Sequence, residues 1–208
     1  MNTTSIIKIK RNTWLQLFVI YTRYLIGSAF VFASIVKIKG ERFSRPGIND
    51  PINTPFHLFE TLYQTGLWWQ IIGWGQFIAG TLLLTQRYAL LGAVANFPII
   101  INVFFITISL NFSGTPLISS SMLLANILLL IWHWPQLKVL VNQKPNDFLK
   151  GTVESLKIWE LIGVGMLITT ILTRIWHPFN EFLWAIAMLV LGLIALVYWF
   201  VNNRKMKI

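Results

Sequence analysis

An arginine in the middle of the first long apolar run constrains the fold more than any other feature. The run, WLQLFVIYTRYLIGSAFVFASIVK, covers residues 14–37, and its arginine is Arg23. About 20 apolar residues in a helix cross a hydrocarbon core of roughly 30 Å, so the run predicts a membrane-spanning helix. A charged group at that depth costs about 2.5–3.5 kcal/mol to insert and normally faces protein, a partner or trapped water. Arg23 therefore predicts a buried polar site, and the alternative is that its side chain extends toward one membrane face.

The composition of the chain agrees with an integral membrane protein in a lipid bilayer. Hydrophobic residues make up 55% of the 208 residues and charged residues only 12%. The net charge of +10 comes from Lys and Arg at the ends of apolar runs, which favours lipid headgroups over nucleic acid as the partner. The chain has no cysteine, which excludes disulfides, thiolate catalysis and cysteine-ligated metal centres. Any redox role would therefore need a cofactor or a partner.

Five further apolar runs predict an all-α protein with six membrane spans. They cover residues 67–85, 88–110, 117–134, 158–175 and 182–201. Within the Gly- and Pro-rich loop 38–66, residues 55–63 carry aromatic side chains at helical spacing, which predicts a short amphipathic helix on the membrane surface. The polar stretch 141–157 predicts a cytoplasmic linker. It would separate a four-helix bundle, residues 1–140, from a C-terminal transmembrane hairpin with a basic tail, residues 158–208.

Basic residues near the span ends set the predicted orientation. With the N-terminus inside, eleven Lys and Arg lie at inner span ends and five at outer ends. This excess predicts that both termini are cytoplasmic. The first loop alone holds four basic residues against three in the N-terminal tail, so the count over the whole chain decides the orientation.

Four polar side chains are predicted to meet at one level of the bundle. Counted at 1.5 Å per residue from the cytoplasmic ends of their spans, all four lie roughly 12–15 Å deep. They are Arg23, Gln76, Asn96 and Asn126. Each would be unfavourable facing lipid, whereas amide carbonyls can accept hydrogen bonds from a guanidinium. The level either holds helices together, at about 0.6 kcal/mol per contact, or forms a pocket for the polar head or carbonyl of a lipid-soluble molecule.

Arg23 has no carboxylate partner within the predicted spans, because Glu60 and Glu160 are expected at the surfaces. This favours an anionic or carbonyl ligand. Asn102 lies in the outer half of its span and would join the level only if the helix bends at Pro98. The secondary candidates for ligand binding are Asn102, Lys37 and Glu60.

The histidines do not predict a metal or haem site. His57 and His177 are expected on the outer surface and His133 on the inner surface, without helical i, i+4 pairing or an acidic cluster. The loops contain no nucleophile elbow, phosphate-binding loop or pair of catalytic carboxylates. The sequence therefore predicts no catalytic residue, no metal and no intrinsic cofactor, and it favours an accessory protein over a stand-alone enzyme.

The first four spans resemble the DoxX family of small bacterial membrane proteins. The resemblance rests on RYLIG at 23–27, SIVK at 34–37, FETLYQTG at 59–66 and GQFIAGTLLL at 75–84, and it covers residues 14–140. The chain departs from the family at Ser34, where glycine is usual, and at Gln76, where glutamate is common. The hairpin from residue 158 lies outside the resemblance.

This resemblance implies a four-helix bundle in the inner (cytoplasmic) membrane of the cell and a role in quinone-linked or redox-stress chemistry. The family is named for the small subunit of a thiosulfate:quinone oxidoreductase. The implied function is a non-catalytic subunit that binds quinone near Arg23 and Gln76 and has a soluble or membrane redox partner. A homo-oligomer is also compatible with the sequence. Two further hypotheses stay open: an assembly or chaperone-like membrane protein, and a small-solute carrier.

Overall fold

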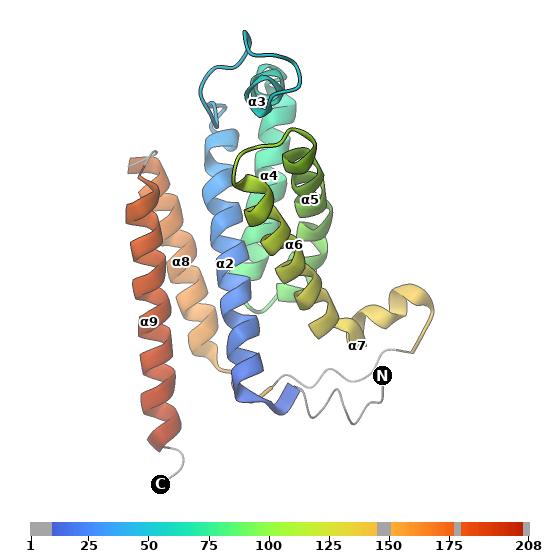
Figure 1. The fold of residues 1–208 in the computed structure, drawn as a ribbon. Coiled ribbons are helices and arrows are strands. Elements are labelled where there is room, and N and C mark those ends of the chain that lie inside the picture. The colour runs from blue at the N-terminus through green and yellow to red at the C-terminus, as the bar shows by residue number, and fades with distance from the viewer. Residues whose placement is uncertain (1–9, 145–150, 177–179, 206–208) are drawn as a thin grey trace.

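A computed structural model describes residues 10–144, 151–176 and 180–205. Every regular element in these ranges is a helix, which confirms the all-α fold class (Figure 1). Six of the described helices are long and apolar enough to cross a membrane, as predicted. They are α2 (Thr13–Ile38), α4 (Leu67–Leu84), α5 (Ala89–Ser109), α6 (Thr115–Trp132), α8 (Lys157–Trp176) and α9 (Glu181–Lys205). The chain is a multi-pass membrane protein on this basis.

Three shorter elements lie at the ends of the long helices. The predicted short helix is confirmed as α3 (Pro55–Gln64), which starts with proline at its first position after the N-cap Thr54. α7 (Trp134–Leu137) and the 3-10 helix η1 (Lys138–Val141) follow α6. Gly66 has a φ of +60° and lets the chain turn directly from α3 into α4.

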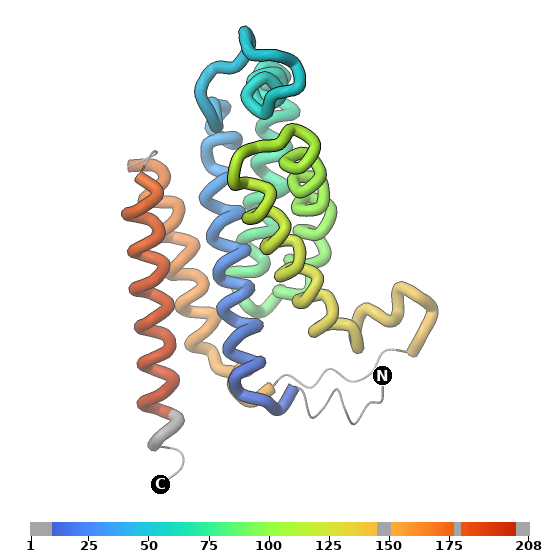
Figure 2. Tube along the Cα trace, viewed as in Figure 1, coloured from blue at the N-terminus to red at the C-terminus, as the bar shows by residue number. Residues whose placement is uncertain are grey.

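α2 is the central helix of the molecule. It packs between α4 and α6 on one side and α8 on the other, while α5 bridges α4 and α6 and α9 packs on α8 (Figure 2). α2 and α4 approach closely at Gly27 and Gly80, where neither helix has a side chain. A Cβ added to Gly27 would lie only 2.8 Å from the carbonyl oxygen of Gly80. A polar residue on the buried face of α2 is therefore surrounded by protein rather than lipid.

Two apolar cores lie on opposite sides of α2. One joins α2 to α4, α5 and α6 through residues such as Phe30, Leu83 and Leu129. The other joins α2 to α8 and α9 through residues such as Tyr24 and Trp159. The outward faces of the helices carry many exposed large apolar side chains, as expected for helices that face lipid rather than water.

The C-terminal hairpin is attached to the bundle more closely than the predicted linker implied. The hydroxyl of Tyr24 donates a 2.5 Å hydrogen bond to the carbonyl oxygen of Trp159. At Gly163 the backbone of α8 comes so close to α4 that an added Cβ would lie 1.8 Å from the carbonyl oxygen of Leu84. Within the predicted linker 141–157, of which residues 145–150 lie outside the described residues, Val153 and Glu154 are buried and so differ from a solvated linker. Glu154 is buried because its carboxylate binds the guanidinium of Arg23.

Candidate functional site

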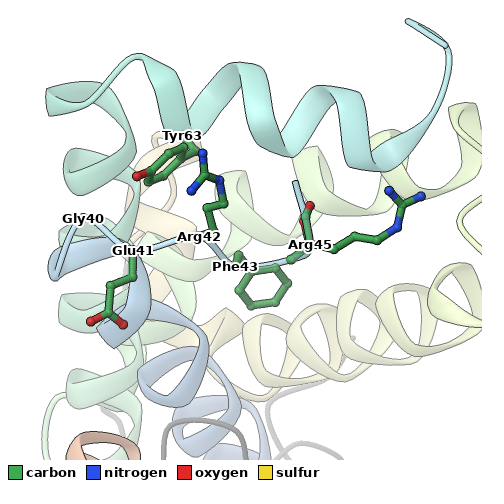
Figure 3. A pocket seen from close by; sticks show the side chains of 7 residues that line it. Gly40, Glu41, Arg42, Phe43, Arg45 and Tyr63 are labelled. Atoms are coloured by element: carbon green, nitrogen blue, oxygen red, sulfur yellow. The ribbon is translucent and has the colours of Figure 1, made fainter. Parts of the chain in front are cut away.

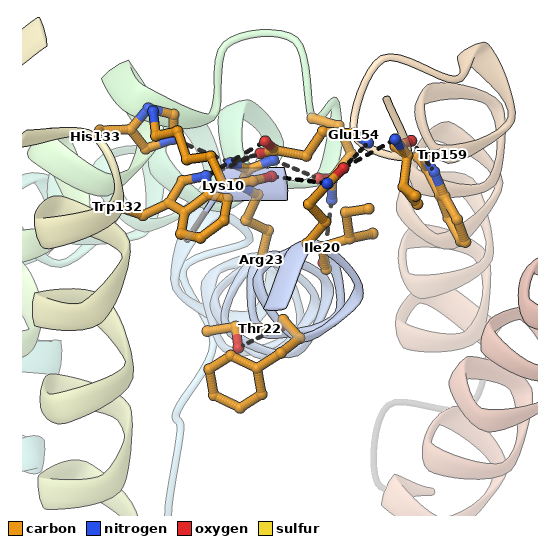
Figure 4. A network of polar contacts seen from close by, with 12 residues as sticks. Lys10, Ile20, Thr22, Arg23, Trp132, His133, Glu154 and Trp159 are labelled. Carbon is orange, nitrogen blue, oxygen red and sulfur yellow. Dashed lines mark hydrogen bonds and ion pairs between the residues drawn. The ribbon is translucent and has the colours of Figure 1, made fainter. Parts of the chain in front are cut away.

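A cluster of buried polar side chains surrounds Arg23 at the end of the bundle where α2 begins (Figure 4). Its members come from four segments: the start of α2, the turn between α4 and α5, the end of α6, and the residues before α8. We call this group the Arg23 cluster. It consists of Lys10, Gln16, Arg23, Gln86, Trp132, His133 and Glu154, all of them buried.

The guanidinium of Arg23 has three protein partners. Nη2 donates to Glu154 Oε1 at 2.6 Å and lies 3.1 Å from His133 Nε2, and Nη1 donates to Gln86 Oε1 at 3.1 Å. Only 3% of the Arg23 surface is exposed. The expectation that no carboxylate reaches Arg23 is therefore wrong, because Glu154 neutralises it. With Glu154 as its partner, Arg23 needs no anionic ligand to balance its charge.

Residues 151–154 wrap around Gln16 and carry Glu154 into the cluster. The side-chain oxygen of Gln16 accepts hydrogen bonds from the backbone nitrogens of Val153 at 2.9 Å and Glu154 at 3.1 Å. Gly151 packs so closely that a Cβ there would lie 2.2 Å from Cδ of Gln16. Trp132 Nε1 donates to Glu154 Oε1 at 3.2 Å. These hydrogen bonds hold the Glu154 carboxylate next to Arg23.

His133 is a neutral acceptor in this arrangement. A guanidinium only donates hydrogen bonds, so the Nε2 atom that faces Arg23 must accept. Nδ1 then carries the proton and donates to Gln136 Oε1 at 3.1 Å. Lys10 adds a second cation, whose pKa is lowered to about 8 by burial although the charge of Glu154 acts to raise it. The terminal nitrogens of Arg23 are thus bound by protein groups, and only its buried Nε has no partner among the described residues. These bonds fit a structural role.

The structure separates Arg23 from the three amides predicted at its level. The depth count assumed that all spans start at one level, but α2 extends beyond its neighbours, so Arg23 lies beside the turn residue Gln86 instead of Gln76. Gln86 has a left-handed φ of +56°. The predicted contact of Arg23 with Gln76, Asn96 and Asn126 is therefore wrong.

Two of the predicted residues do meet. Nδ2 of Asn96 donates to Oδ1 of Asn126 at 3.0 Å, and Nδ2 of Asn126 donates to the carbonyl oxygen of Ala93 at 3.1 Å. Both asparagines are fully buried. This chain of bonds joins α5 to α6 deep within the bundle.

Two of the predicted residues, one of them in this asparagine pair, have a buried amide oxygen without a donor among the described residues. Oε1 of Gln76 and Oδ1 of Asn96 are buried and accept no hydrogen bond in the part of the chain that the structure describes. Gln76 lies ten residues before Gln86 and Asn96 ten residues after it, so the α4–α5 hairpin places them at about the same depth. A buried acceptor without a partner costs about 1–3 kcal/mol. We call these two atoms the amide acceptor pair.

The secondary candidates lie elsewhere. Asn102 is exposed on the outer face of α5 and does not join the pair. Lys37 is buried at the other end of α2, where its Nζ donates to the carbonyl oxygen of Ala33 at 2.8 Å and lies 4.3 Å from the centroid of the Phe43 ring. Glu60 is also buried and forms an ion pair with Arg42, with Nε 2.9 Å from Oε2.

An open pocket of about 750 Å³ lies in the loop that follows α2 (Figure 3). It is lined by residues 40–45 and Tyr63. The guanidinium of Arg42 is held between Glu60 and the ring of Tyr63, whose centroid lies 4.4 Å away. Arg45 extends away from this pair and binds Asp50. The sequence did not indicate this pocket, because its walls come from a loop and a helix 18 residues apart.

The Arg42–Glu60 pair predicts a loss of stability in acid. Hydrogen bonds from Arg42 lower the pKa of Glu60 below its ordinary value of 4.5, although burial acts in the opposite direction. Because the folded-state pKa is the lower one, the pair stabilises the loop above about pH 4.5 and this contribution is lost as the pH falls through the folded-state pKa. The difference in melting temperature between wild type and Glu60→Gln should therefore be larger at pH 7 than at pH 4. A difference that does not change with pH would contradict this account.

No family model, curated protein or solved structure matches this chain. Among the described residues, no group of three or more His, Cys, Asp or Glu side chains could hold a metal ion. Membership of the DoxX family therefore stays a prediction from the sequence. The geometry of the Arg23 cluster and of the amide acceptor pair is the basis for a functional assignment.

Proposed function

We propose that the chain is a non-catalytic membrane subunit of a quinone-linked or redox-stress complex, and that it binds a quinol at the amide acceptor pair. The observation that carries this proposal is that Gln76 Oε1 and Asn96 Oδ1 are enclosed in a membrane bundle without donors. The resemblance to the DoxX family supplies the ligand class. The proposed site differs from the one expected from the sequence, since Arg23 is not part of it.

The chemistry of Asn96 favours the reduced form of the ligand. An amide oxygen only accepts hydrogen bonds, so it can bind the hydroxyl of a quinol but not the carbonyl of a quinone. Asn96 cannot turn its amide group to offer a donor, because its Nδ2 already donates to Asn126 Oδ1. The Asn126 amide is fixed as well, since its Nδ2 donates to the carbonyl oxygen of Ala93. A quinol hydroxyl would satisfy an acceptor that is otherwise unpaired.

The surroundings of the pair suit an apolar ring. Ala93, whose carbonyl binds Asn126, belongs to the apolar core that also contains Phe30, Ile100 and Leu129. The chain has no cysteine that could carry electrons, so a soluble or membrane redox partner would oxidise or reduce the ligand. In the proposed orientation the Arg23 cluster and both termini lie on the cytoplasmic side of the inner membrane.

Retention of quinol tests the proposal. The protein is purified in mild detergent without oxygen, and bound quinol and quinone are extracted and quantified. Gln76→Leu and Asn96→Leu each remove one acceptor, and loss of one hydrogen bond should lower retained quinol about 3- to 10-fold. Asn102→Leu is the matched control, because Asn102 lies on the same helix as Asn96 but is exposed on its outer face.

The same preparation separates the alternative functions. Copurification of one redox protein together with quinol supports the proposal. Equal quinol in wild type and both acceptor variants, or wild-type protein without quinol, would reject it. Capture of several unrelated membrane proteins would favour the assembly function, and neither ligand nor partner would leave the solute carrier to be tested by transport assays.

A further inference from the structure

Arg174, near the C-terminal end of α8, is a buried arginine that has no hydrogen-bond or ion-pair partner among the described residues. Only 6% of its surface is exposed, and its Nε atom is enclosed without a hydrogen bond. Within the described residues, no hydrogen bond or ion pair reaches any nitrogen of this side chain, whereas Arg23 binds Glu154 and Arg42 binds Glu60. Buried arginines normally have such partners, because an unpaired buried charge is costly.

A pair of stacked aromatic side chains from two other helices lies beside Arg174. Its guanidinium carbon lies 4.2 Å from the centroid of the Phe32 ring on α2. Phe32 packs on Trp184 of α9 with ring centroids 4.6 Å apart, and Trp184 Nε1 donates to Thr170 Oγ1 of α8 at 3.2 Å. Arg174 is therefore held in a built corner between α2, α8 and α9.

This corner lacks one negative charge. Arg174 interacts electrostatically with Glu41 and Glu181, and its charge also acts on Lys37. Lys39 is paired with Glu41, with Nζ 2.6 Å from Oε1. Neither carboxylate is within ion-pair distance of Arg174 among the described contacts, so the charge of Arg174 itself is left without a close counter-charge. One bound monoanion would neutralise the group.

The position of Arg174 matches the level of lipid headgroups. It lies two residues before Trp176, which ends α8 and is exposed, as is typical of an aromatic residue at a membrane interface. Long basic side chains near the ends of membrane helices reach the headgroup region. Guanidinium groups bind phosphate oxygens through paired, charge-assisted hydrogen bonds.

We propose that Arg174 and its corner form a binding site for a phosphate monoanion. The phosphate would accept hydrogen bonds from the guanidinium, which packs on the ring of Phe32, and that ring in turn packs on Trp184. Two sources supply this chemistry: the phosphodiester of a membrane lipid and free inorganic phosphate. The site is separate from the amide acceptor pair and from the Arg23 cluster.

Thermal unfolding of the full chain in a phosphate-free maltoside detergent distinguishes the sources. Phosphatidylglycerol is added in one arm and inorganic phosphate in another. At about 100-fold excess over Kd, a bound ligand should raise the Tm of a chain of this size by about 5–10 °C. Stabilisation by phosphatidylglycerol alone assigns a lipid site, and stabilisation by inorganic phosphate assigns a site for the free ion.

Arg174→Gln should abolish this rise and lower the phospholipid retained in native mass spectra about 10-fold. Arg87→Gln is the matched control, because Arg87 is exposed at the other end of the bundle and its loss should leave the rise intact. If Arg174→Gln does not fold, Arg174→Lys keeps the charge without the planar fork and should show a reduced rise. An equal rise in wild type and the Arg174 variants, or no rise in wild type with either addition, overturns the proposal.

Discussion

Replacing Glu154 with leucine is expected to destabilise the protein by about 3–5 kcal/mol, because it leaves the buried charge of Arg23 without its anion. The ion pair is short, at 2.6 Å, and both side chains are 3% exposed. Trp132 Nε1 would lose its acceptor in the same variant. The free energy of unfolding in detergent, followed by tryptophan fluorescence, measures the effect.

Glu160→Leu is the control for this variant. It removes a carboxylate six residues further along, in the first turn of α8, and Glu160 takes part in no ion pair among the described residues. Its expected cost is about 0.3–1 kcal/mol, from the loss of a favourable charge at a helix N-terminus. Equal destabilisation by the two variants would mean that Glu154 does not neutralise Arg23.

Gly163→Ala is expected to loosen the attachment of α8 to the bundle, at a cost of about 3 kcal/mol or more. The added methyl carbon would lie 1.8 Å from the carbonyl oxygen of Leu84, and this backbone atom cannot move aside as a flexible side chain would. The displaced helix would also strain the hydrogen bond between Tyr24 and Trp159. Protease sensitivity of the hairpin and the melting temperature report the change.

Gly165→Ala provides the matched comparison on the same helix. Nothing lies within 4 Å of the position where its Cβ would be, so the substitution meets open space. Alanine is favoured over glycine in a helix by about 0.5–1 kcal/mol, and this variant should be slightly stabilised. A similar loss of stability in both variants would contradict the close contact of α8 with α4.

The membrane spans could be predicted because their signal is local. An apolar run of about 20 residues carries its own evidence of a spanning helix. The burial of Arg23 was also predictable, since an arginine within such a run requires a polar environment. The contact between Asn96 and Asn126 followed from two amides at similar depth in neighbouring helices, and the structure brings them together.

The partner of Arg23 could not be found from local patterns. Glu154 lies 131 residues away in a stretch whose polar composition is typical of a linker. One signal was present: a buried arginine needs a counter-charge, and the chain has only seven acidic residues. Of these, Asp147 and Glu154 are the two in the stretch between the fourth and fifth spans. The depth count failed for a second reason, because α2 extends past its neighbours and shifts Arg23 from Gln76 to Gln86.

The Arg23 cluster and the amide acceptor pair are separate, and we assign them different roles. The terminal nitrogens of Arg23 bind Glu154, Gln86 and His133, and only its Nε is left without a partner among the described residues, so we assign this cluster the role of attaching residues 151–156 and α8 to the bundle. The amide acceptor pair is left without donors and is the proposed ligand site. Substitutions in the cluster should therefore change stability first, and substitutions of Gln76 should change ligand retention at nearly unchanged stability.

A double-mutant cycle on Arg23 and Glu154 tests the central structural claim most directly. Arg23→Met, Glu154→Met and the double variant are compared with wild type by their free energies of unfolding in detergent. The account predicts a coupling energy of about 2–3 kcal/mol, with the double variant more stable than either single variant, because methionine in both positions leaves no buried unpaired charge. Additive effects, with a coupling energy below about 0.5 kcal/mol, would show that the pair does not form and that Glu154 does not hold the hairpin to the bundle.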